Sequence, residues 1–183
     1  MYEAALFLMD GFEEIEAVTP LDILRRSGID VVSVSLTDEL EVVGAHGICI
    51  EADLMFDELK NVENTTLILP GGPGVVNYKG HEGLHEMLIK HNNRGGRIAA
   101  ICAAPTVLGS LGILKDKRAV CHPSKENELN AKEIVWQSVV TDGNITTSLA
   151  AGTSMAFAVE LVKLLKGEAA ADEVTRHAFL KVE

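Results

Sequence analysis

Short apolar runs alternate along the chain with segments in which apolar residues recur about once per helical turn. The runs are nearly continuous and rich in aliphatic residues, which is typical of strands buried on both faces, as in a parallel sheet. Four such runs lie at residues 4–8, 31–36, 66–69 and 97–102. Shorter runs at 48–50, 139–141 and 145–149 predict hairpin strands, and Asp142-Gly143 between the last two is a strong tight-turn signal.

Helical periodicity fills the intervals between these runs. One apolar stripe facing the core is predicted from residues that recur at about one turn, namely Ile15, Val18, Leu21 and Leu24. Similar patterns predict helices around residues 84–89, 107–111, 155–165 and 169–177. Because strands that alternate with helices form right-handed βαβ units, the pattern predicts an α/β fold. We expect a flavodoxin-like, doubly wound, mostly parallel sheet with helices on both faces, formed by residues 1–183 as one domain.

Charge and hydropathy narrow the classes of partner. The chain has 27 acidic and 16 basic side chains and a net charge of −11, which opposes binding to nucleic acid or to anionic lipid. No apolar stretch is long enough to span a bilayer, and the first apolar run lacks the basic flank of a signal peptide. We therefore expect neither a nucleic-acid partner nor a membrane association.

The cysteines and histidines argue against a disulfide framework and a metal site. The three cysteines have irregular spacing and include no CxxC pair, so the reducing cytosol is the simplest compartment. His81 and His85 are four residues apart, but the intervening Gly83 weakens a helix that would bring them together. No metal site is expected.

Candidate chemistry is expected where the strands end. In open α/β sheets, ligands bind beyond the carboxyl ends of the strands. The segments that follow the predicted strands are residues 10–16, 71–74, 102–105 and 121–123.

Cys102 is the strongest candidate for a working residue. It follows a strand-like run, and Pro105 fits the first turn of a helix, so Cys102 is expected on the turn between the two. Small neighbours permit a sharp turn of the nucleophile-elbow kind, and free N–H groups at a helix N-terminus favour a thiolate. The alternative is a buried cysteine that acts as a small apolar residue. That structural interpretation is favoured for Cys49 and Cys121, which lie inside strand-like runs.

Pro70-Gly71-Gly72-Pro73-Gly74 follows the third strand-like run. Glycines let the backbone approach a ligand and aim N–H groups at an anion. The segment lacks the Lys-Ser/Thr of a P-loop and the spacing of a dinucleotide fingerprint. A tight turn without a ligand is an equally good interpretation of this segment alone.

Glu16 and His122 are weaker candidates. A partly buried Glu16 carboxyl beside a thiol could stay protonated and donate a hydrogen bond, although a surface glutamate is the simpler interpretation. His122 precedes Pro123, so its backbone is expected to be extended at a strand end, where it could exchange protons with the cysteine. A histidine in such a place is more often a surface or packing residue.

Five segments of the chain carry motifs that occur together in one family. They read GFEEIEAVTPLDILRRSGI near the start, LILPGGPG in the middle, RIAAICAAPTVLG around the cysteine, CHPSKE after it, and TSLAAGTSMAFAVELVKLLKG near the end. With these motifs the chain resembles the ThiJ/PfpI superfamily over essentially its whole length. The resemblance is to the DJ-one branch, named for the parkinsonism-associated protein, and it implies a class I glutamine amidotransferase-like sheet and a homodimer.

The resemblance also implies roles for individual residues. Cys102 matches the reactive, easily oxidised nucleophile, and Glu16 matches the glutamate that hydrogen-bonds its sulfur. Gly72 and Ala103 match positions whose backbone N–H groups face a developing oxyanion, and His122 matches the nearby histidine.

Three departures from the family pattern bear on activity. Ala103 stands where the protease-like branch has a histidine, His46 stands where arginine is common near the dimer interface, and Pro73 replaces a common asparagine.

The implied activity is cofactor-free action on reactive carbonyls, of the glutathione-independent glyoxalase or protein deglycase type, with small aldehydes or glycated protein adducts as substrates. A redox sensor or chaperone that works through oxidation of Cys102 is the alternative. A peptidase, an amidase or a link to thiamine biosynthesis is a weaker interpretation.

Overall fold

The computed structural model describes residues 2–180, and a seven-stranded sheet lies at its centre. The strand order is β10-β11-β7-β6-β1-β2-β5, and every neighbouring pair is parallel except β10 and β11. The strands are β1 (Ala4–Leu8), β2 (Val31–Ser35), β5 (Leu54–Met55), β6 (Thr66–Leu69), β7 (Ile98–Ile101), β10 (Val139–Asp142) and β11 (Ile145–Ser148). The predicted doubly wound, mostly parallel sheet is confirmed.

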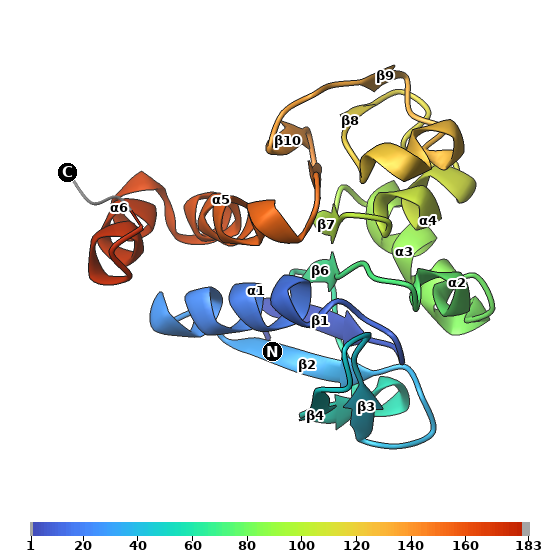
Figure 1. The fold of residues 1–183 in the computed structure, drawn as a ribbon, viewed down its shortest axis with the longest axis horizontal. Helices are drawn as coiled ribbons and strands as arrows, with labels where there is room; N and C mark the ends of the chain where they lie inside the picture. The colour runs from blue at the N-terminus through green and yellow to red at the C-terminus, as the bar shows by residue number, and fades with distance from the viewer. Residues whose placement is uncertain (1, 181–183) are drawn as a thin grey trace.

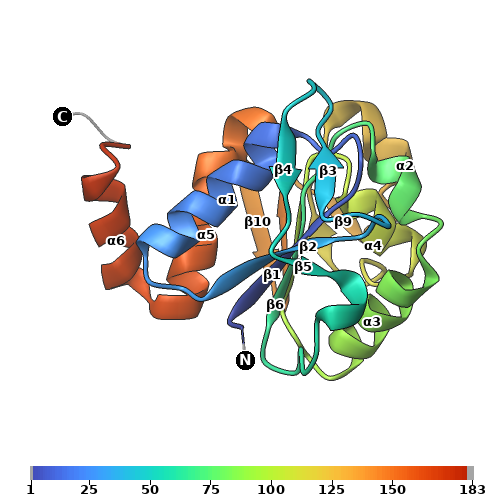
Figure 2. The ribbon, with the colours of Figure 1, turned by 90° about the horizontal axis from the view of Figure 1, so that it is seen from below.

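Helices cover both faces of this sheet (Figures 1 and 2). One face carries α1 (Glu14–Arg26) and α5 (Ser154–Lys166), and the other carries α2 (Val75–Tyr78), α3 (Glu82–Asn93) and α4 (Pro105–Ser110). A further helix, α6 (Glu168–His177), packs on α5. Two small sheets lie outside the main one: the antiparallel hairpin of β3 (Glu41–Val43) and β4 (Cys49–Glu51), and the parallel pair β8 (Arg118–Ala119) and β9 (Glu133–Ile134).

Short 3-10 segments complete the secondary structure of the described residues. They are η1 (Phe56–Glu58), η2 (Pro123–Glu128, which is two turns long) and η3 (Ala151–Thr153). None of the described helices is long and apolar enough to cross a bilayer.

The core consists of two apolar clusters, one on each face of the sheet. In β1, Ala5 and Phe7 join the cluster beneath α3 and α4, whereas Leu6 and Leu8 join the cluster beneath α1 and α5. This division follows from the strand, in which successive side chains point to opposite faces. Because both faces are buried, the central strands read as continuous apolar runs in the sequence.

The apolar stripe predicted on α1 is wrong in its first turn. Ile15 and Val18 are 54% and 46% exposed, while Leu21 and Leu24 are buried as expected. The buried face includes Glu16 instead, which a polarity pattern assigns to the solvent. The helix is therefore rotated relative to the sequence prediction, and this rotation carries a carboxyl into the protein.

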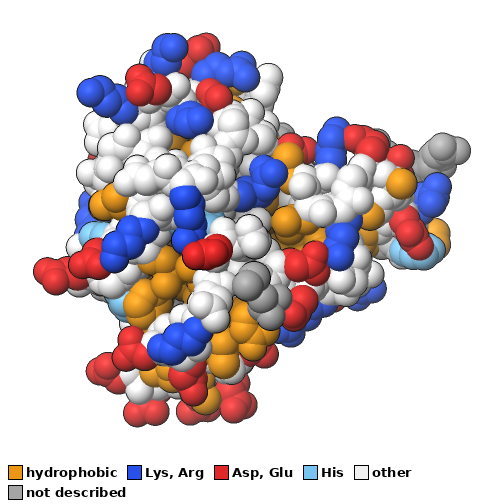
Figure 3. Space-filling view, turned by 180° about the vertical axis from the view of Figure 1, so that it is seen from behind, with side chains coloured by type: hydrophobic (Ala, Val, Ile, Leu, Met, Phe, Trp, Pro, Cys, Tyr) orange, Lys and Arg blue, Asp and Glu red, His pale blue; other side chains and the backbone are white. Residues whose placement is uncertain are grey.

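Helices α5 and α6 extend from the body of the molecule. Figure 3 shows this extension in profile, with apolar side chains visible on it and charged side chains of both signs scattered over the same face. The helix predicted around residues 169–177 is thus confirmed and lies on the side of the protein that carries α1 and α5.

Candidate active site

Cys102 lies on a sharp turn between β7 and α4. Its backbone has φ = 64°, in the left-handed region that non-glycine residues seldom adopt, and Pro105 begins the helix that follows. Two neighbouring segments hold the strained peptide: the N–H of Cys102 donates to the carbonyl of Ser148 (3.0 Å), and the N–H of His122 donates to the carbonyl of Cys102 (2.7 Å). The predicted elbow is confirmed, and the thiol is only partly covered.

The glycine loop after β6 packs directly against this elbow. A Cβ atom built on Gly71 would lie 2.7 Å from the Cys102 Cβ and 2.7 Å from Oε2 of Glu16, so only glycine fits between them. Gly72 has φ = 99°, and the N–H groups of Gly72 and Ala103 are near enough to the Cys102 sulfur to lower the pKa of the thiol. Both expected N–H groups thus lie near the sulfur, and their role toward an oxyanion stays a prediction.

Glu16 is fully buried beside the cysteine, so the surface interpretation of this residue is wrong. Its Oε2 accepts a hydrogen bond from the N–H of Gly71 (2.8 Å), while Oε1 has no partner by distance and angle among the described residues. Burial raises the pKa of Glu16 to about 7, against hydrogen bonds from the Cys102 thiol and the Gly71 N–H that lower it. The carboxyl can therefore hold or release a proton near neutral pH.

Cys102 and Glu16 titrate as a coupled pair. Burial and the negative charge of Glu16 raise the pKa of the Cys102 thiol to about 12, more than the two N–H donors lower it. The N–H donors thus favour a thiolate, as expected, but burial and the charge of Glu16 outweigh them while Glu16 is ionised. When Glu16 keeps the proton, the repulsion disappears and the carboxyl becomes a donor to sulfur, so a single proton decides which group carries the charge.

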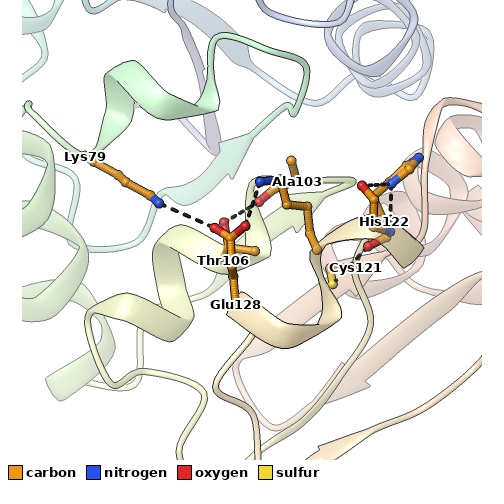
Figure 4. A network of polar contacts seen from close by, with 8 residues as sticks. Lys79, Ala103, Thr106, Cys121, His122 and Glu128 are labelled. Atoms are coloured by element: carbon orange, nitrogen blue, oxygen red, sulfur yellow. Dashed lines mark hydrogen bonds and ion pairs between the residues drawn. The ribbon is translucent and has the colours of Figure 1, made fainter.

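The backbone of His122, rather than its ring, contacts the elbow, because its N–H donates to the carbonyl of Cys102. Its imidazole Nδ1 lies 2.8 Å from Oγ of Ser124 and accepts the N–H of Ser124 (3.2 Å), which caps η2. Figure 4 shows this arrangement, together with the Lys79–Glu128 ion pair that links α2 to η2 near Ala103. The His122 backbone has φ = −55° and ψ = 134°, a polyproline-like conformation expected before a proline, but β8 ends at Ala119, so the predicted strand end is wrong. No hydrogen bond joins the ring to Cys102 within residues 2–180.

The other two cysteines differ from each other. Cys121 is buried, and its thiol donates to the carbonyl of His122 (3.4 Å), in keeping with a structural role. Burial raises the pKa of the Cys121 thiol to about 11. Cys49 is exposed on β4, so its assignment to the protein interior is wrong. The hairpin of β3 and β4 lies outside the main sheet, and one of its sides faces solvent.

A buried carboxylate next to the site was missed by the sequence analysis. Oε1 of Glu14 accepts the N–H of His46 (2.6 Å), and Oε2 lies 2.8 Å from the imidazole Nδ1. Burial opposes the charge, but hydrogen bonds from His46 and Ile48 outweigh it and lower the pKa of Glu14 to about 2. Among the described residues, the side chains of Glu13, Glu14 and His46 lie close enough together to be considered as a cation site. The His46 ring, however, already contacts both carboxylates, at 2.8 Å for Glu14 and 3.8 Å for Glu13.

His46 and Pro73, two of the departures named above, contact different segments. His46 joins the hairpin turn to α1, whereas Pro73 lies against Gly11, in the loop after β1. The sequence could not predict the contact between His46 and Glu14, because 32 residues separate the two and only the fold brings them together.

Several known proteins are similar to this chain. Over 168 residues it is 38% identical to Protein DJ-1 homolog B of Arabidopsis thaliana, covering 90% of this chain and 38% of that protein. It is 32% identical to Deglycase PfpI of Pyrococcus furiosus, covering 88% of this chain and 98% of that protein. The chain spans less than half the length of the two Arabidopsis relatives, 38% of one and 45% of the other.

Solved structures share the fold as a whole. A DJ-1 superfamily protein from Salmonella typhimurium superposes with a TM-score of 0.92 at 34% identity, covering 98% of both chains. Toxoplasma gondii DJ-1, in a structure described as oxidized, superposes with a TM-score of 0.90 at 31% identity, again over 98% of both chains. The model of the DJ-1/PfpI family matches residues 2–164. The chain belongs to the DJ-1/PfpI family.

Proposed function

We propose that this protein acts on reactive carbonyls without glutathione, in the manner of a glyoxalase or protein deglycase, through the Cys102 sulfur. The observation that carries the proposal is the left-handed elbow at Cys102, with a buried carboxyl of raised pKa beside it and two N–H donors facing it. A relative named a deglycase, 32% identical over 88% of the chain, supports the same activity class. No cofactor is needed for this chemistry.

The reaction begins with attack of the Cys102 sulfur on the aldehyde carbon of methylglyoxal. An S–C bond forms, the carbonyl π electrons move to oxygen, and the resulting oxyanion lies where the N–H groups of Gly72 and Ala103 can donate to it. Protonation gives a hemithioacetal. Glu16 then removes the proton from the former aldehyde carbon and returns a proton to the adjacent carbon, which yields a thioester. Water cleaves the S–C bond, so methylglyoxal and one water become lactate and the thiol is regenerated.

Glu16 suits both directions of this proton transfer. A general acid–base works best when its pKa is near the working pH, and the pKa of Glu16 is raised to about 7. When Glu16 donates its proton to the substrate oxygen it becomes an acceptor for the next step. We assign His122 no proton transfer, because no hydrogen bond joins its ring to Cys102 within residues 2–180 and its Nδ1 accepts the N–H of Ser124.

Turnover of methylglyoxal without glutathione tests the proposal. We expect lactate formation by the wild type and its loss in Cys102→Ser, with Cys121→Ser as the matched control because that thiol is buried and faces a backbone carbonyl. Full activity of Cys102→Ser, or no lactate from fully reduced wild type, would contradict the proposal.

A redox sensor is the second candidate, and the same geometry favours it. A partly exposed thiol with N–H donors and a carboxyl beside it can hold a sulfenic or sulfinic acid, formed when peroxide oxidises the sulfur and is itself reduced to water. The oxidised state of the Toxoplasma relative supports the comparison. Mass spectrometry after mild peroxide is expected to show oxygen at Cys102 before Cys121; equal oxidation of the two thiols would contradict a sensor role.

A peptidase fits the site less well. A thiol protease needs a base that takes the thiol proton, and Ala103 stands where the protease-like branch has a histidine. His122 offers Nδ1 to Ser124 instead. No residue of the site bears on thiamine biosynthesis.

We also propose that the protein is a homodimer. Ile15 and Val18 are adjacent exposed apolar residues on α1, and Met155 is exposed on α5, which packs beside α1. Such side chains are commonly covered in assemblies. Sedimentation is expected to give twice the monomer mass for the wild type and the monomer mass for an Ile15→Glu, Val18→Glu variant; a monomeric wild type would contradict this. The cytosolic location stays a prediction.

A further inference from the structure

Tyr78 is the last residue of α2, the short helix that follows β6 through the glycine loop (Figure 1). Its ring is 1% exposed and lies in the apolar cluster beneath α3 and α4. The phenol oxygen lies 3.1 Å from the carbonyl oxygen of Phe7 in β1 and 3.2 Å from that of Pro70, and its O–H donates to these carbonyls. Because a buried hydroxyl carries a desolvation cost that a phenylalanine ring does not, packing alone does not explain a tyrosine here.

The carbonyl of Pro70 belongs to the same peptide group as the N–H of Gly71. That N–H donates to Oε2 of Glu16 (2.8 Å), and the carbonyl of Gly71 accepts the N–H of Glu13 (2.9 Å), which precedes α1. A chain of hydrogen bonds thus runs from the Tyr78 hydroxyl through one peptide group to the Glu16 carboxyl. Because successive hydrogen bonds polarise one another, a donor at the Pro70 carbonyl makes the Gly71 N–H a stronger donor.

The peptide group before Gly71 has little room to move. Gly71 fits between Cys102 and Glu16 only because it lacks a Cβ atom. A small rotation of its peptide would therefore change the hydrogen bond to Glu16. Tyr78 is itself held by α3, because Nε2 of His85 lies 2.7 Å from the Tyr78 carbonyl oxygen. The Tyr78 hydroxyl is thus a fixed donor that sets the orientation of the peptide.

The Tyr78 phenol keeps its proton over the range in which Glu16 titrates. Burial and the negative charge of Glu16 raise the pKa of the Tyr78 hydroxyl. Among the described residues, the titratable groups that act on Glu16 are the Cys102 thiol from the elbow, Glu13 ahead of α1, and Tyr78 from α2. Tyr78 contacts the peptide rather than the carboxyl, so it acts through the strength and direction of the Gly71 N–H.

We propose that Tyr78 is a positioning residue, whose hydroxyl aligns and polarises the peptide before Gly71 so that the N–H stabilises the ionised carboxyl of Glu16. The inference rests on the proposed function, in which that carboxyl exchanges protons with the substrate. Tyr78 takes no part in the bond changes at Cys102. Without the hydroxyl, the Gly71 N–H is a weaker donor and Glu16 keeps its proton to higher pH. The Cys102 thiolate is then free of the repulsion from Glu16 over that range.

Alkylation of Cys102 by iodoacetamide, followed by mass spectrometry of the peptide that contains it, tests this alignment without any substrate. In Tyr78→Phe we expect the alkylation rate at pH 8.5 to rise about 2- to 10-fold, because the weaker N–H raises the pKa of Glu16. This is a fraction of the roughly 10- to 100-fold that loss of a whole hydrogen bond to a charged group would give. The rate at pH 5.5 is expected to stay the same, since Glu16 is protonated there in both proteins.

Turnover is expected to change in the opposite direction in the same variant. Glu16 must be ionised to remove the proton from the substrate carbon, so kcat for methylglyoxal at pH 7 is expected to fall about 2- to 5-fold and to recover at higher pH. A variant that had only a loosened fold would show altered alkylation at both pH values. The two opposite changes therefore separate positioning of Glu16 from a purely structural role of Tyr78.

Thr65→Val is the matched control. The Thr65 hydroxyl is also buried and donates to a backbone carbonyl, that of Tyr2 (2.8 Å). It lies just before Thr66, at the opposite end of β6 from Pro70. Thr65→Val is therefore expected to lose a similar amount of stability and to keep the wild-type pH profile of alkylation.

The Glu16→Gln variant shows whether the effect of Tyr78 passes through the carboxyl. Glutamine has no proton to retain, so addition of Tyr78→Phe to Glu16→Gln is expected to leave the alkylation rate unchanged. Identical alkylation profiles in wild type and Tyr78→Phe, or an equal rise in the Glu16→Gln background, would overturn the proposal. Absence of lactate from the wild type while the alkylation profile still changes in Tyr78→Phe would sink the proposed function and leave the positioning role standing.

Discussion

Glu14 and Glu16 lie two residues apart in the first turn of α1, and both are buried, yet their carboxyls behave in opposite ways. Hydrogen bonds from His46 and Ile48 in the hairpin loop outweigh burial and lower the pKa of Glu14 to about 2. Burial dominates at Glu16 and raises its pKa to about 7. The same residue type in the same helical turn thus has a lowered pKa on one side of the helix and a raised pKa on the other.

The two carboxyls differ in depth of burial, which is greater for Glu16, and in the number of donors that each one meets. Glu14 accepts from two backbone N–H groups and an imidazole, whereas Glu16 accepts from the Gly71 N–H and otherwise faces a thiol. A buried carboxyl is held ionised when several donors surround it and neutral when few do. Glu14 therefore links the hairpin to α1, and the proton transfer proposed for Glu16 at Cys102 relies on its raised pKa.

The largest effect is expected from Glu16→Gln on turnover. Glutamine keeps the size of the side chain but cannot exchange a proton, so kcat for methylglyoxal is expected to fall by about 10²- to 10⁴-fold. Glu14→Gln, on the same helical turn, is the matched control and is expected to keep most of the activity. Comparable losses in both variants would show that the two carboxyls do not have separate roles.

The next largest effect is on stability as a function of pH. The pKa of Glu16 is raised from 4.5 to about 7, so between these values the folded state holds a proton that the unfolded state has lost. Stability is then fully present below pH 4.5, declines as the pH rises toward 7, and levels off above it. The decline is on the order of 3 kcal/mol at most, since one pKa unit corresponds to about 1.4 kcal/mol. Thermal unfolding from pH 4 to 8 is expected to show this decline in the wild type and its absence in Glu16→Gln.

Much of the fold can be predicted from the sequence, because strands that are buried on both faces have continuous apolar runs. Short strands without such runs cannot be predicted in this way. β1, β2, β6 and β7 are buried on both faces, so their apolar runs are unambiguous. β5, β8 and β9 have two residues each, and their pairing depends on the neighbouring strand rather than on any pattern of their own. Periodicity predicted the extent of α1 but not its orientation, because apolar spacing alone does not reveal that the polar side chain of Glu16 is buried.

The site is predictable in part for similar reasons. The elbow at Cys102 follows from a strand, small residues and a proline, all local in sequence. The burial of Glu16 depends on Gly71, 55 residues away, and the capping role of the His122 ring depends on how η2 begins. The family resemblance identified Glu16 as the glutamate beside the cysteine. The lowered pKa of Glu14 could not be predicted from the sequence, because it depends on His46 in the hairpin loop, which the fold places against α1.

A smaller effect is expected from Glu14→Gln on stability. The amide accepts at one atom only, so the hydrogen bond to the His46 ring is lost and the loop loses its charged anchor. The cost is about 1–3 kcal/mol, the range for hydrogen bonds to a charged group. Chemical denaturation at pH 7 measures it, and at pH 2.5 the difference from wild type is expected to narrow. The reason is that Glu14 contributes stability above pH 4.5 that is lost as the pH falls toward about 2.

The smallest effect on stability is expected from substitution of His46, because this partner of Glu14 is exposed to solvent. The hydrogen bond to Glu14 raises the pKa of His46 above 6.5, so its contribution is fully present below pH 6.5 and fades as the pH rises through the shifted value. His46→Ala is therefore expected to lower Tm more at pH 5.5 than at pH 9. His46→Asn, whose amide can donate from a similar position, is expected to behave like the wild type at pH 9 only. Equal destabilisation of His46→Ala at both pH values would contradict this prediction. It would mean that the neutral imidazole stabilises Glu14 as well as the protonated one does, so that hydrogen bonds rather than an ion pair keep Glu14 ionised.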